Sequence, residues 1–433
     1  MVGRTGVRCR VKENPLQCKA REKTPAVQGE RKPLALQGAN NFWIRRRARN
    51  DGGFAFVLLL IGLYNRRLFS ITAQAVLKIK HVCFAGDMYM KAVLLTGVRQ
   101  MEIKDVPACT VEEDNGVLLK IRKVGICGSD VHYYETGQIG TQIVKYPFIL
   151  GHECVGTVEA VGKKVTTVTR GQMAAVDPAV SCHQCRQCRM GRENTCYNLK
   201  FLGTPGQGDG CLREYIVMPE ECCFPIDGRV TAEQGVLCEP LSIAVYAVKG
   251  SRPAKNGDAA ILGAGPLGLC CLVCLKADNV NRCYMTERIE SRMRMAEKAG
   301  ASWVGNPDRE DIVEEIGRQC PAGVDVVYEC AGQQETIDQG VELLRPGGKL
   351  VIIGIPRVEK IFFNIDKLRR KEITVINVRR QNKCTASAID LIACGKVNVD
   401  FMITHRFTLE QVQEGFELVA GYADGVVKAI IDM

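Results

Sequence analysis

The sequence predicts an α/β protein in which a β-rich domain is followed by a doubly wound α/β domain. From Met90 to about Pro225, short apolar stretches alternate with turns that contain Gly and Pro, which is typical of a barrel-like β domain. Beyond Asp258, continuous apolar strands alternate with helical segments, which indicates a parallel sheet with helices on both faces. A glycine-rich turn at 263–268 lies between one such strand and the next helix.

The apolar patterns predict the individual elements in order. In the first domain we expect strands over 90–97 and 117–127, and a helix over 235–250. In the second domain the pattern predicts strands over 259–265, 282–287, 324–332 and 349–355. Helices are expected over 266–278 and 291–300, the latter ending at Gly300.

The net charge of +10 lies entirely in the N-terminal stretch. Residues 1–87 carry 17 Lys/Arg and 5 Asp/Glu, which leaves 41 basic and 43 acidic residues for 88–433. The rest of the chain therefore offers no electrostatic footprint for nucleic acid, and we expect no nucleic-acid partner.

Residues 1–87 show no sustained strand or helix period, and three interpretations of this basic extension remain open. It is upstream sequence translated from a start set too early, with the true start near Met88 or Met90, or a disordered or targeting extension, or a membrane anchor. Its apolar run, Phe54–Tyr64, has eleven residues, whereas a membrane-spanning helix needs about 20. We therefore expect no membrane partner.

Four cysteines form a tight C-x2-C-x2-C-x7-C cluster, SCHQCRQCRMGRENTC. Cys182, Cys185, Cys188 and Cys196 suit a closed tetrahedral shell on one structural Zn²⁺. A pair of disulfides is the alternative, but disulfides suit small secreted chains. Many of the other cysteines, among the 22 in the chain, lie in apolar surroundings, where free cysteine behaves as a small hydrophobe. So many unpaired thiols predict a reducing cytoplasm.

The glycine-rich turn has the G-x-G-x-x-G spacing of a dinucleotide-binding loop. Between a strand and a helix, such a turn lets a pyrophosphate approach the helix N-terminus. Glu287, 24 positions after Gly263, is placed to accept hydrogen bonds from a ribose and to repel a 2′-phosphate, which favours NAD over NADP. Arg288 and Arg292 lie close by and weaken that preference. The residues of the turn itself are Gly263, Gly265, Pro266, Leu267 and Gly268.

A second set of metal ligands is expected upstream of the cysteine cluster. Cys127 in GICGSDVH, with His152 and Glu153 in GHECVGTVEAVG, are all competent zinc ligands. Three protein ligands leave a fourth position for water or substrate, which is the pattern of a catalytic zinc.

Taken in order, the motifs C-G-S-D-x-H, G-H-E-x2-G-x5-G-x2-V, the four-cysteine lobe, E-P-L-S and G-x-G-x-x-G resemble those of the zinc-dependent medium-chain dehydrogenases. Within that family the likeness is closest to the polyol (sorbitol-type) branch, through TPGQGDGCLREY, CEPLSIAV and VNVDFMITHRF. The resemblance implies a GroES-like catalytic domain from 88–240 and 380–433, with a structural-zinc lobe at about 178–200. It implies a Rossmann NAD-binding domain from 241–379.

The resemblance also implies roles for single residues. Glu239 matches a glutamate that reaches the catalytic metal directly or through water, and Ser129 and His132 match a proton relay from the substrate hydroxyl through the nicotinamide ribose to solvent. Tyr133 and Arg380 match positions near the polyol, although Gln381 replaces the aromatic residue expected beside Arg380. Gly354, at the end of the strand over 349–355, is expected to let the backbone approach the nicotinamide.

The implied activity is the transfer of hydride from a secondary alcohol, a polyol such as sorbitol or xylitol, to NAD, giving a ketone. Zinc lowers the pKa of a bound hydroxyl enough for this at neutral pH. Alternatives are the same chemistry on L-threonine, a sugar acid or a simple alcohol, or a non-catalytic zinc- and NAD-binding protein. We further expect a homo-oligomer, a dimer or a tetramer.

Overall fold

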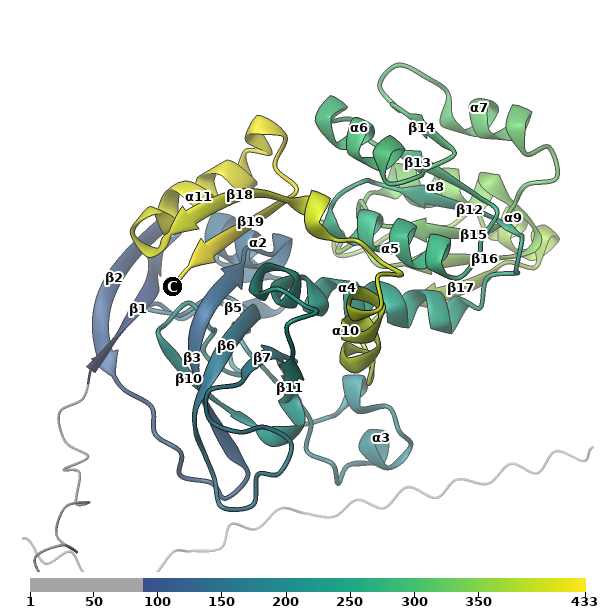
Figure 1. The fold of residues 1–433 in the computed structure, drawn as a ribbon. Coiled ribbons are helices and arrows are strands. Elements are labelled where there is room, and N and C mark those ends of the chain that lie inside the picture. The colour runs from purple at the N-terminus through teal and green to yellow at the C-terminus, as the bar shows by residue number, and fades with distance from the viewer. Residues whose placement is uncertain (1–88) are drawn as a thin grey trace, which may run out of the picture. The chain divides into compact units, whose positions relative to one another are not determined.

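The computed structural model describes residues 89–433 (Figure 1). The three interpretations of residues 1–87 therefore concern a segment outside the described residues. The predicted start near Met88 or Met90 lies at the border of the described range. No helix between residues 89 and 433 combines the length and the apolarity that crossing a membrane requires.

The first sheet is mostly antiparallel and has seven strands in the order β11-β7-β6-β3-β19-β18, with β10 also paired to β3. Only β18 and β19, from the end of the chain, run parallel to each other. The strand bounds are β3 Gly116–Gly125, β6 Glu153–Val161, β7 Met173–Val176, β10 Tyr215–Pro219, β11 Cys223–Ile226, β18 Ile403–Thr408 and β19 Lys428–Asp432. Three separate two-stranded antiparallel sheets complete the strand list: β1 Tyr89–Gly97 with β2 Gln100–Pro107, β4 Gln138–Ile139 with β5 Gln142–Ile143, and β8 Ala179–Val180 with β9 Lys200–Phe201.

The second sheet is parallel and has six strands in the order β14-β13-β12-β15-β16-β17. This 3-2-1-4-5-6 arrangement is that of a doubly wound Rossmann sheet, as the sequence predicts. The bounds are β12 Asp258–Leu262, β13 Arg282–Thr286, β14 Trp303–Gly305, β15 Val324–Glu329, β16 Leu344–Ile352 and β17 Thr374–Asn377. Residues alternate between its two faces: Ala259 and Ile261 lie in one buried cluster, and Ala260 and Leu262 in the other.

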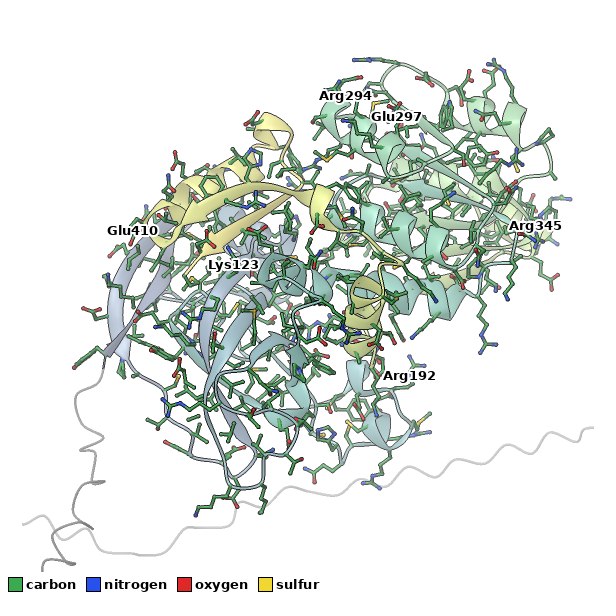
Figure 2. The ribbon with its side chains drawn as sticks, in the orientation of Figure 1. Lys123, Arg192, Arg294, Glu297, Arg345 and Glu410 are labelled. Atoms are coloured by element: carbon green, nitrogen blue, oxygen red, sulfur yellow. The ribbon has the colours of Figure 1, made fainter. Side chains whose placement is uncertain are left out.

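Helices cover both faces of the parallel sheet. The helices α4 Ala232–Ser251, α5 Pro266–Ala277, α6 Glu290–Lys298 and α10 Thr385–Ala393 contribute to one cluster, and α7 Ile312–Gln319 and α8 Gln334–Leu343 to the other. Charged side chains such as Arg294 and Glu297 lie on the exposed side of α6 (Figure 2). The remaining helices are α2 Gly128–Thr136, α3 Arg186–Arg189, α9 Ile365–Lys371, α11 Val412–Ala420 and the 3₁₀ turns η2 Glu193–Thr195, η3 Glu220–Cys222, η4 Asp400–Met402, η5 Leu409–Gln411 and η6 Ala423–Gly425.

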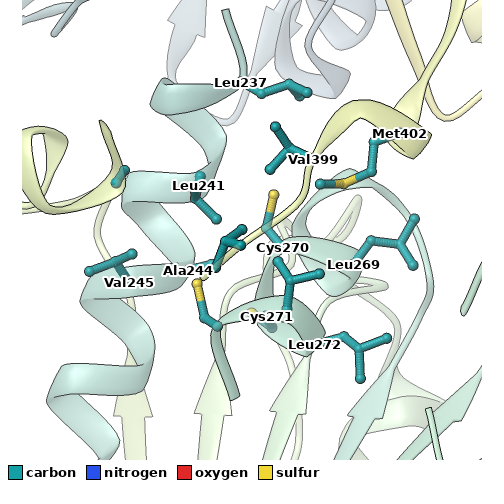
Figure 3. Close-up of a cluster of buried hydrophobic side chains, with 14 of the residues drawn as sticks. Leu237, Leu241, Ala244, Val245, Leu269, Cys270, Cys271, Leu272, Val399 and Met402 are labelled. Atoms are coloured by element: carbon teal, nitrogen blue, oxygen red, sulfur yellow. The ribbon is translucent and has the colours of Figure 1, made fainter. Parts of the chain in front are cut away.

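Helix α4 is longer than the sequence predicts and begins at a capping box. The Thr231 side chain accepts from the Gln234 N–H, and the Gln234 side chain accepts from the Thr231 N–H. Leu237 and Leu241 of α4 and Leu269 of α5 belong to the same buried cluster (Figure 3). Burying one such leucine contributes about 1.5–3 kcal/mol. The expected domain boundary at 240 falls inside this helix.

Candidate active site and metal centres

The four cysteines of the lobe lie together, with one sulfur of each within 4.8 Å of the others. The Sγ atoms of Cys185 and Cys188 are 3.5 Å apart, and those of Cys182 and Cys196 are 3.4 Å apart. A disulfide needs about 2.05 Å, and all cysteines in the described range 89–433 are free thiols. Hydrogen bonds from the Gln184 backbone and the Asn198 side chain lower the pKa of Cys182 to about 6. A preformed four-thiolate group of this kind fits Zn²⁺.

The lobe is tied to the segment that carries Arg380. The Asn194 side-chain amide donates to the Arg379 carbonyl at 3.0 Å, and the Asn382 amide donates to the Gly191 carbonyl at 2.7 Å. Lys383 and Glu193 form an ion pair at 2.9 Å. These contacts fix the position of residues 379–383 relative to the cysteine lobe.

Cys127, His152 and Glu153 form that second group, again with ligand atoms within 4.8 Å of one another. Cys127 precedes α2, and His152 and Glu153 stand at the start of β6. The two segments meet because Gly125, at the end of β3, pairs with Glu153 in the antiparallel register. One thiolate, one imidazole and one carboxylate suit Zn²⁺, and three protein donors leave a position open.

Asp130 orients His152, a role that the sequence analysis missed. The Asp130 carboxylate, 1% exposed, lies 3.2 Å from His152 Nδ1 and accepts from the Gly151 N–H at 3.1 Å. Nδ1 is then the protonated nitrogen, which leaves Nε2 as the donor to a metal. The signal was present in C-G-S-D, where the aspartate follows Cys127 by three residues.

Glu239 of α4 lies beside this group but is outside it. Burial raises its pKa to about 7, which the charge of His152 opposes and that of Glu153 reinforces. A carboxyl that titrates near neutrality next to metal ligands is suited to contact the metal through water.

Helix α2 carries the other predicted catalytic residues. Ser129 Oγ lies 3.4 Å from Cys127 Sγ, and the Tyr133 hydroxyl donates to Gln142 Oε1 at 3.1 Å. His132 is half-buried; burial and the nearby Arg357 guanidinium lower its pKa, so the ring is neutral at pH 7. Within residues 89–433 the structure places no hydrogen bond between Ser129 and His132, so the two are not linked directly.

Arg380 is half-buried, and its side chain makes few compensating contacts. Its guanidinium carbon lies 3.4 Å from the ring centroid of Phe201, whose ring centroid is 5.4 Å from that of His152. Its Nη1 is buried and has no hydrogen-bond partner among the described residues. Burial lowers its pKa to about 9, which leaves the guanidinium charged at pH 7. Sequence reasoning missed Phe201, which supplies the aromatic contact that Gln381 does not.

Gln381 has a structural place instead. Its side chain is buried, donates to Asp177 Oδ2 at 2.5 Å and accepts from the Cys384 N–H at 2.7 Å. It fixes the start of α10 against the end of β7.

The glycine-rich turn joins β12 to α5, with Gly265 as the N-cap and Pro266 and Leu267 in the first turn. Gly263 has φ +104°, and a Cβ on Gly268 would lie 1.9 Å from the Gly263 carbonyl oxygen. Beside Gly265, by contrast, a Cβ would meet only Arg292 Nη1 at 4.0 Å, so the loop surface is open. The helix N-terminus therefore presents free N–H groups, which fit a pyrophosphate.

Glu287 follows β13 directly. Its Oε2 accepts from the Ala264 N–H at 3.0 Å, and its Oε1 accepts from the Arg288 and Ile289 N–H groups. The carboxylate is thereby held next to the glycine-rich turn. Gly354 follows β16, and its N–H donates to the Glu329 carbonyl at 3.0 Å.

The two arginines near Glu287 face other partners. Arg288 is exposed and pairs with Asp308 at 2.9 Å. Arg292 is buried, donates to the Val426 carbonyl and lies over the Tyr422 ring at 5.3 Å. Both guanidinium groups thus have protein partners, but Arg292 also lies at the turn, because its Nη1 would be 4.0 Å from a Cβ on Gly265.

A Rossmann sheet with this turn and an open three-ligand group defines the class of a zinc-binding dehydrogenase. The chain matches the family described as "Alcohol dehydrogenase GroES-like domain" over residues 113–228 and that described as "Zinc-binding dehydrogenase" over residues 266–394. It belongs to this family and is an oxidoreductase, as the resemblance implies.

Individual relatives agree with this assignment. The chain is 34% identical to the sorbitol dehydrogenase of Bacillus subtilis, over 79% of this chain and 97% of that protein. It is 33% identical to D-xylulose reductase A of Aspergillus oryzae, over 78% and 96% of the two chains. A solved putative zinc-binding dehydrogenase of Sinorhizobium meliloti bound to NADP is similar with a TM-score of 0.74 and 31% identity, over 80% of this chain and all of that one (100%).

Proposed function

We propose that the protein oxidises a secondary hydroxyl of a polyol to a ketone, with NAD as the hydride acceptor and zinc at two sites. The observation that carries the proposal is the group Cys127, His152 and Glu153, whose donor atoms lie within 4.8 Å of one another in a protein that also has a dinucleotide-binding turn. The likeness to a sorbitol dehydrogenase and a D-xylulose reductase supports a polyol as substrate.

The three donors would hold the catalytic zinc, and the four cysteines of the lobe a structural one. Zinc in the three-ligand site supplies Lewis acidity, which lowers the pKa of a substrate hydroxyl. The chain's own residues supply the other functions. Asp130 fixes the tautomer of His152. Ser129, beside Cys127, would accept the released proton, and His132, which has no direct hydrogen bond to Ser129 among the described residues, would deliver it to solvent. Because His132 is neutral at pH 7, it is ready to accept a proton. Tyr133 and Arg380 orient the substrate.

The turn at 263–268 would bind the pyrophosphate and Glu287 the adenosine ribose. The fixed carboxylate of Glu287, together with the pairing of Arg288 to Asp308, supports NAD over NADP. The test compares kcat/KM for the two cofactors. We expect the value to be at least tenfold higher with NAD, and a ratio below one would overturn the cofactor assignment.

A sugar acid is the second candidate substrate class, because the buried Nη1 of Arg380 lacks a partner. A carboxylate would pair with such a guanidinium through charge-assisted hydrogen bonds. A panel of neutral polyols, sugar acids and L-threonine, followed by NADH absorbance, tests both classes. Turnover of neutral polyols confirms the proposal, and turnover of acids alone selects the second candidate.

We also propose a domain division near the predicted one, a homo-oligomer, and a cytoplasmic location. The first is supported by β18 and β19, which join the first sheet although they follow the second in sequence. A homo-oligomer is supported by exposed apolar side chains at Ile355, Phe362 and Ile365, which follow β16 and reach the first residue of α9. The free thiols of residues 89–433 support a reducing compartment. Light scattering of the purified protein tests the oligomer.

A further inference from the structure

Lys428, near the C-terminus, lies against the three-ligand group. It is the first residue of β19 and is 1% exposed. Its Nζ contacts Glu153 Oε1 at 2.8 Å, Glu153 Oε2 at 2.6 Å and the Ile126 carbonyl oxygen at 3.2 Å. One ammonium group therefore contacts both segments that carry the metal ligands, because Ile126 directly precedes Cys127.

The Glu153 carboxylate also occupies a space that a glycine provides. Gly125 pairs with Glu153 on one side and with Ile430 on the other. A Cβ on Gly125 would lie 2.4 Å from Glu153 Oε2. The Glu153 carboxylate thus lies between the backbone of Gly125, which has no side chain, and the Lys428 ammonium group.

The charges explain why a lysine is needed there. Glu153 is 1% exposed, and a carboxylate removed from water in this way costs several kcal/mol unless a cation or strong donors compensate it. Cys127 adds a second negative charge when it binds a metal as a thiolate. Lys428 uses its three donors on two carboxylate oxygens and one carbonyl, so its hydrogen-bonding capacity is filled.

We propose that Lys428 is a positioning residue of the catalytic metal site, which holds the Glu153 carboxylate and the Cys127 segment in the arrangement that binds zinc. The last strand of the chain is then part of the metal site, although it lies 275 residues from Glu153. This rests on the proposed function only in assigning zinc to Cys127, His152 and Glu153. It assigns no contact between Lys428 and the substrate.

The test measures zinc affinity on the full-length, zinc-loaded protein by competition with a chelating indicator. In Lys428→Met we expect the Kd of one of the two zinc ions to rise by about 10–100-fold, which is typical when a partner of a metal ligand is lost, while the other is unchanged. Lys428→Arg keeps the charge and should raise that Kd less than tenfold. Unchanged Kd values for both ions in Lys428→Met would overturn the proposal.

Lys123→Met is the matched control. Lys123, labelled in Figure 2, also contacts β19 through a partly exposed ion pair with Asp432, and it pairs with Glu233 as well. Within residues 89–433 no ion pair joins it to Glu153. It should leave both zinc affinities unchanged. A purely structural role for Lys428 would lower the melting temperature of the metal-free protein but leave the Kd of the folded protein as it is.

A crystal structure of the zinc-loaded wild type tests the proposal if the Lys428 variants do not fold. We expect Lys428 Nζ to stay within about 4 Å of the Glu153 carboxylate, the usual limit for an ion pair. A lysine that has turned away from Glu153 would refute the proposal. Failure of the wild type to oxidise any polyol, with normal zinc affinities, would contradict the proposed function alone.

Discussion

The two candidate metal sites are built in opposite ways. The four cysteines of the lobe come from one 15-residue stretch, and two of them are partly exposed. The three-ligand group joins two distant segments, mixes three donor types, and has two buried members. Its outer partners, Asp130 and Lys428, come from α2 and β19. A closed site can thus be local and self-contained, whereas an open site depends on the whole fold to hold its donors without a fourth ligand.

Of the variants considered, His152→Ala should show the largest difference between the two metal sites, because it removes activity and leaves the zinc of the lobe in place. The variant removes one of only three ligands, so we expect kcat/KM to fall by about 10³-fold or more, as several kcal/mol of Lewis-acid stabilisation are lost. The lobe should keep its zinc, and circular dichroism should show an intact fold. NADH formation with the best polyol measures the loss.

The matched control is His183→Ala in the lobe, since His183 is exposed and, within residues 89–433, its ring contacts polar groups of Ser181 and Glu221 alone. It should retain wild-type activity. Zinc-dependent turnover in His152→Ala would show that the open site lies elsewhere.

Cys185→Ser should have the converse effect. Loss of one thiolate from a closed shell removes the metal and the folding free energy that it contributes. We expect the melting temperature to fall by about 5–10 °C, while kcat at 25 °C changes by less than tenfold. Calorimetry and zinc analysis measure this, and a loss of activity as large as that of His152→Ala would contradict the division of roles.

In the metal-free protein, the protonation of Glu239 should make the free energy of unfolding depend on pH. The pKa of Glu239 is about 7 when folded and about 4.5 when unfolded, so the folded state holds the proton more tightly. The contribution of this group to stability therefore falls as pH rises from about 4.5 to 7. In the metal-free protein, Glu239→Gln should therefore gain free energy of unfolding relative to the wild type as the pH rises. We expect this difference between variant and wild type to be about 1–3 kcal/mol larger at pH 8 than at pH 5. Urea unfolding at both pH values tests this, and a pH-independent difference would contradict it.

The smallest effect concerns the contact between the lobe and the active site. Asn194→Ala removes the hydrogen bond to the Arg379 carbonyl, next to Arg380. A lost hydrogen bond of this kind is worth about 1 kcal/mol, so KM should rise about two- to tenfold while kcat changes little. An unchanged KM would mean that the lobe does not position the substrate side chains.

Features that depend on a short stretch of sequence could be predicted, whereas contacts between residues far apart in the sequence could not. The cysteine lobe and six elements of the second domain follow from short patterns, and the structure places these elements as β12, α5, β13, α6, β15 and β16. Strand β14 and helices α7 and α8 were not predicted. Lys428 was missed because its contact with Glu153 depends on β19 returning to the first sheet, which no local period reveals. Phe201 was missed for the same reason, since only the fold brings its ring against Arg380. The helix over 235–250 was predicted too short because the capping box precedes its apolar run.

The most direct test is stepwise zinc loading of the metal-free, full-length protein, with zinc content and NADH production measured on the same samples. Four thiolates should fill first, so protein with one zinc per chain should be folded and inactive. Activity should appear only as the second zinc binds, in proportion to its occupancy. Equal rates of alcohol oxidation by metal-free and fully loaded protein would contradict the account.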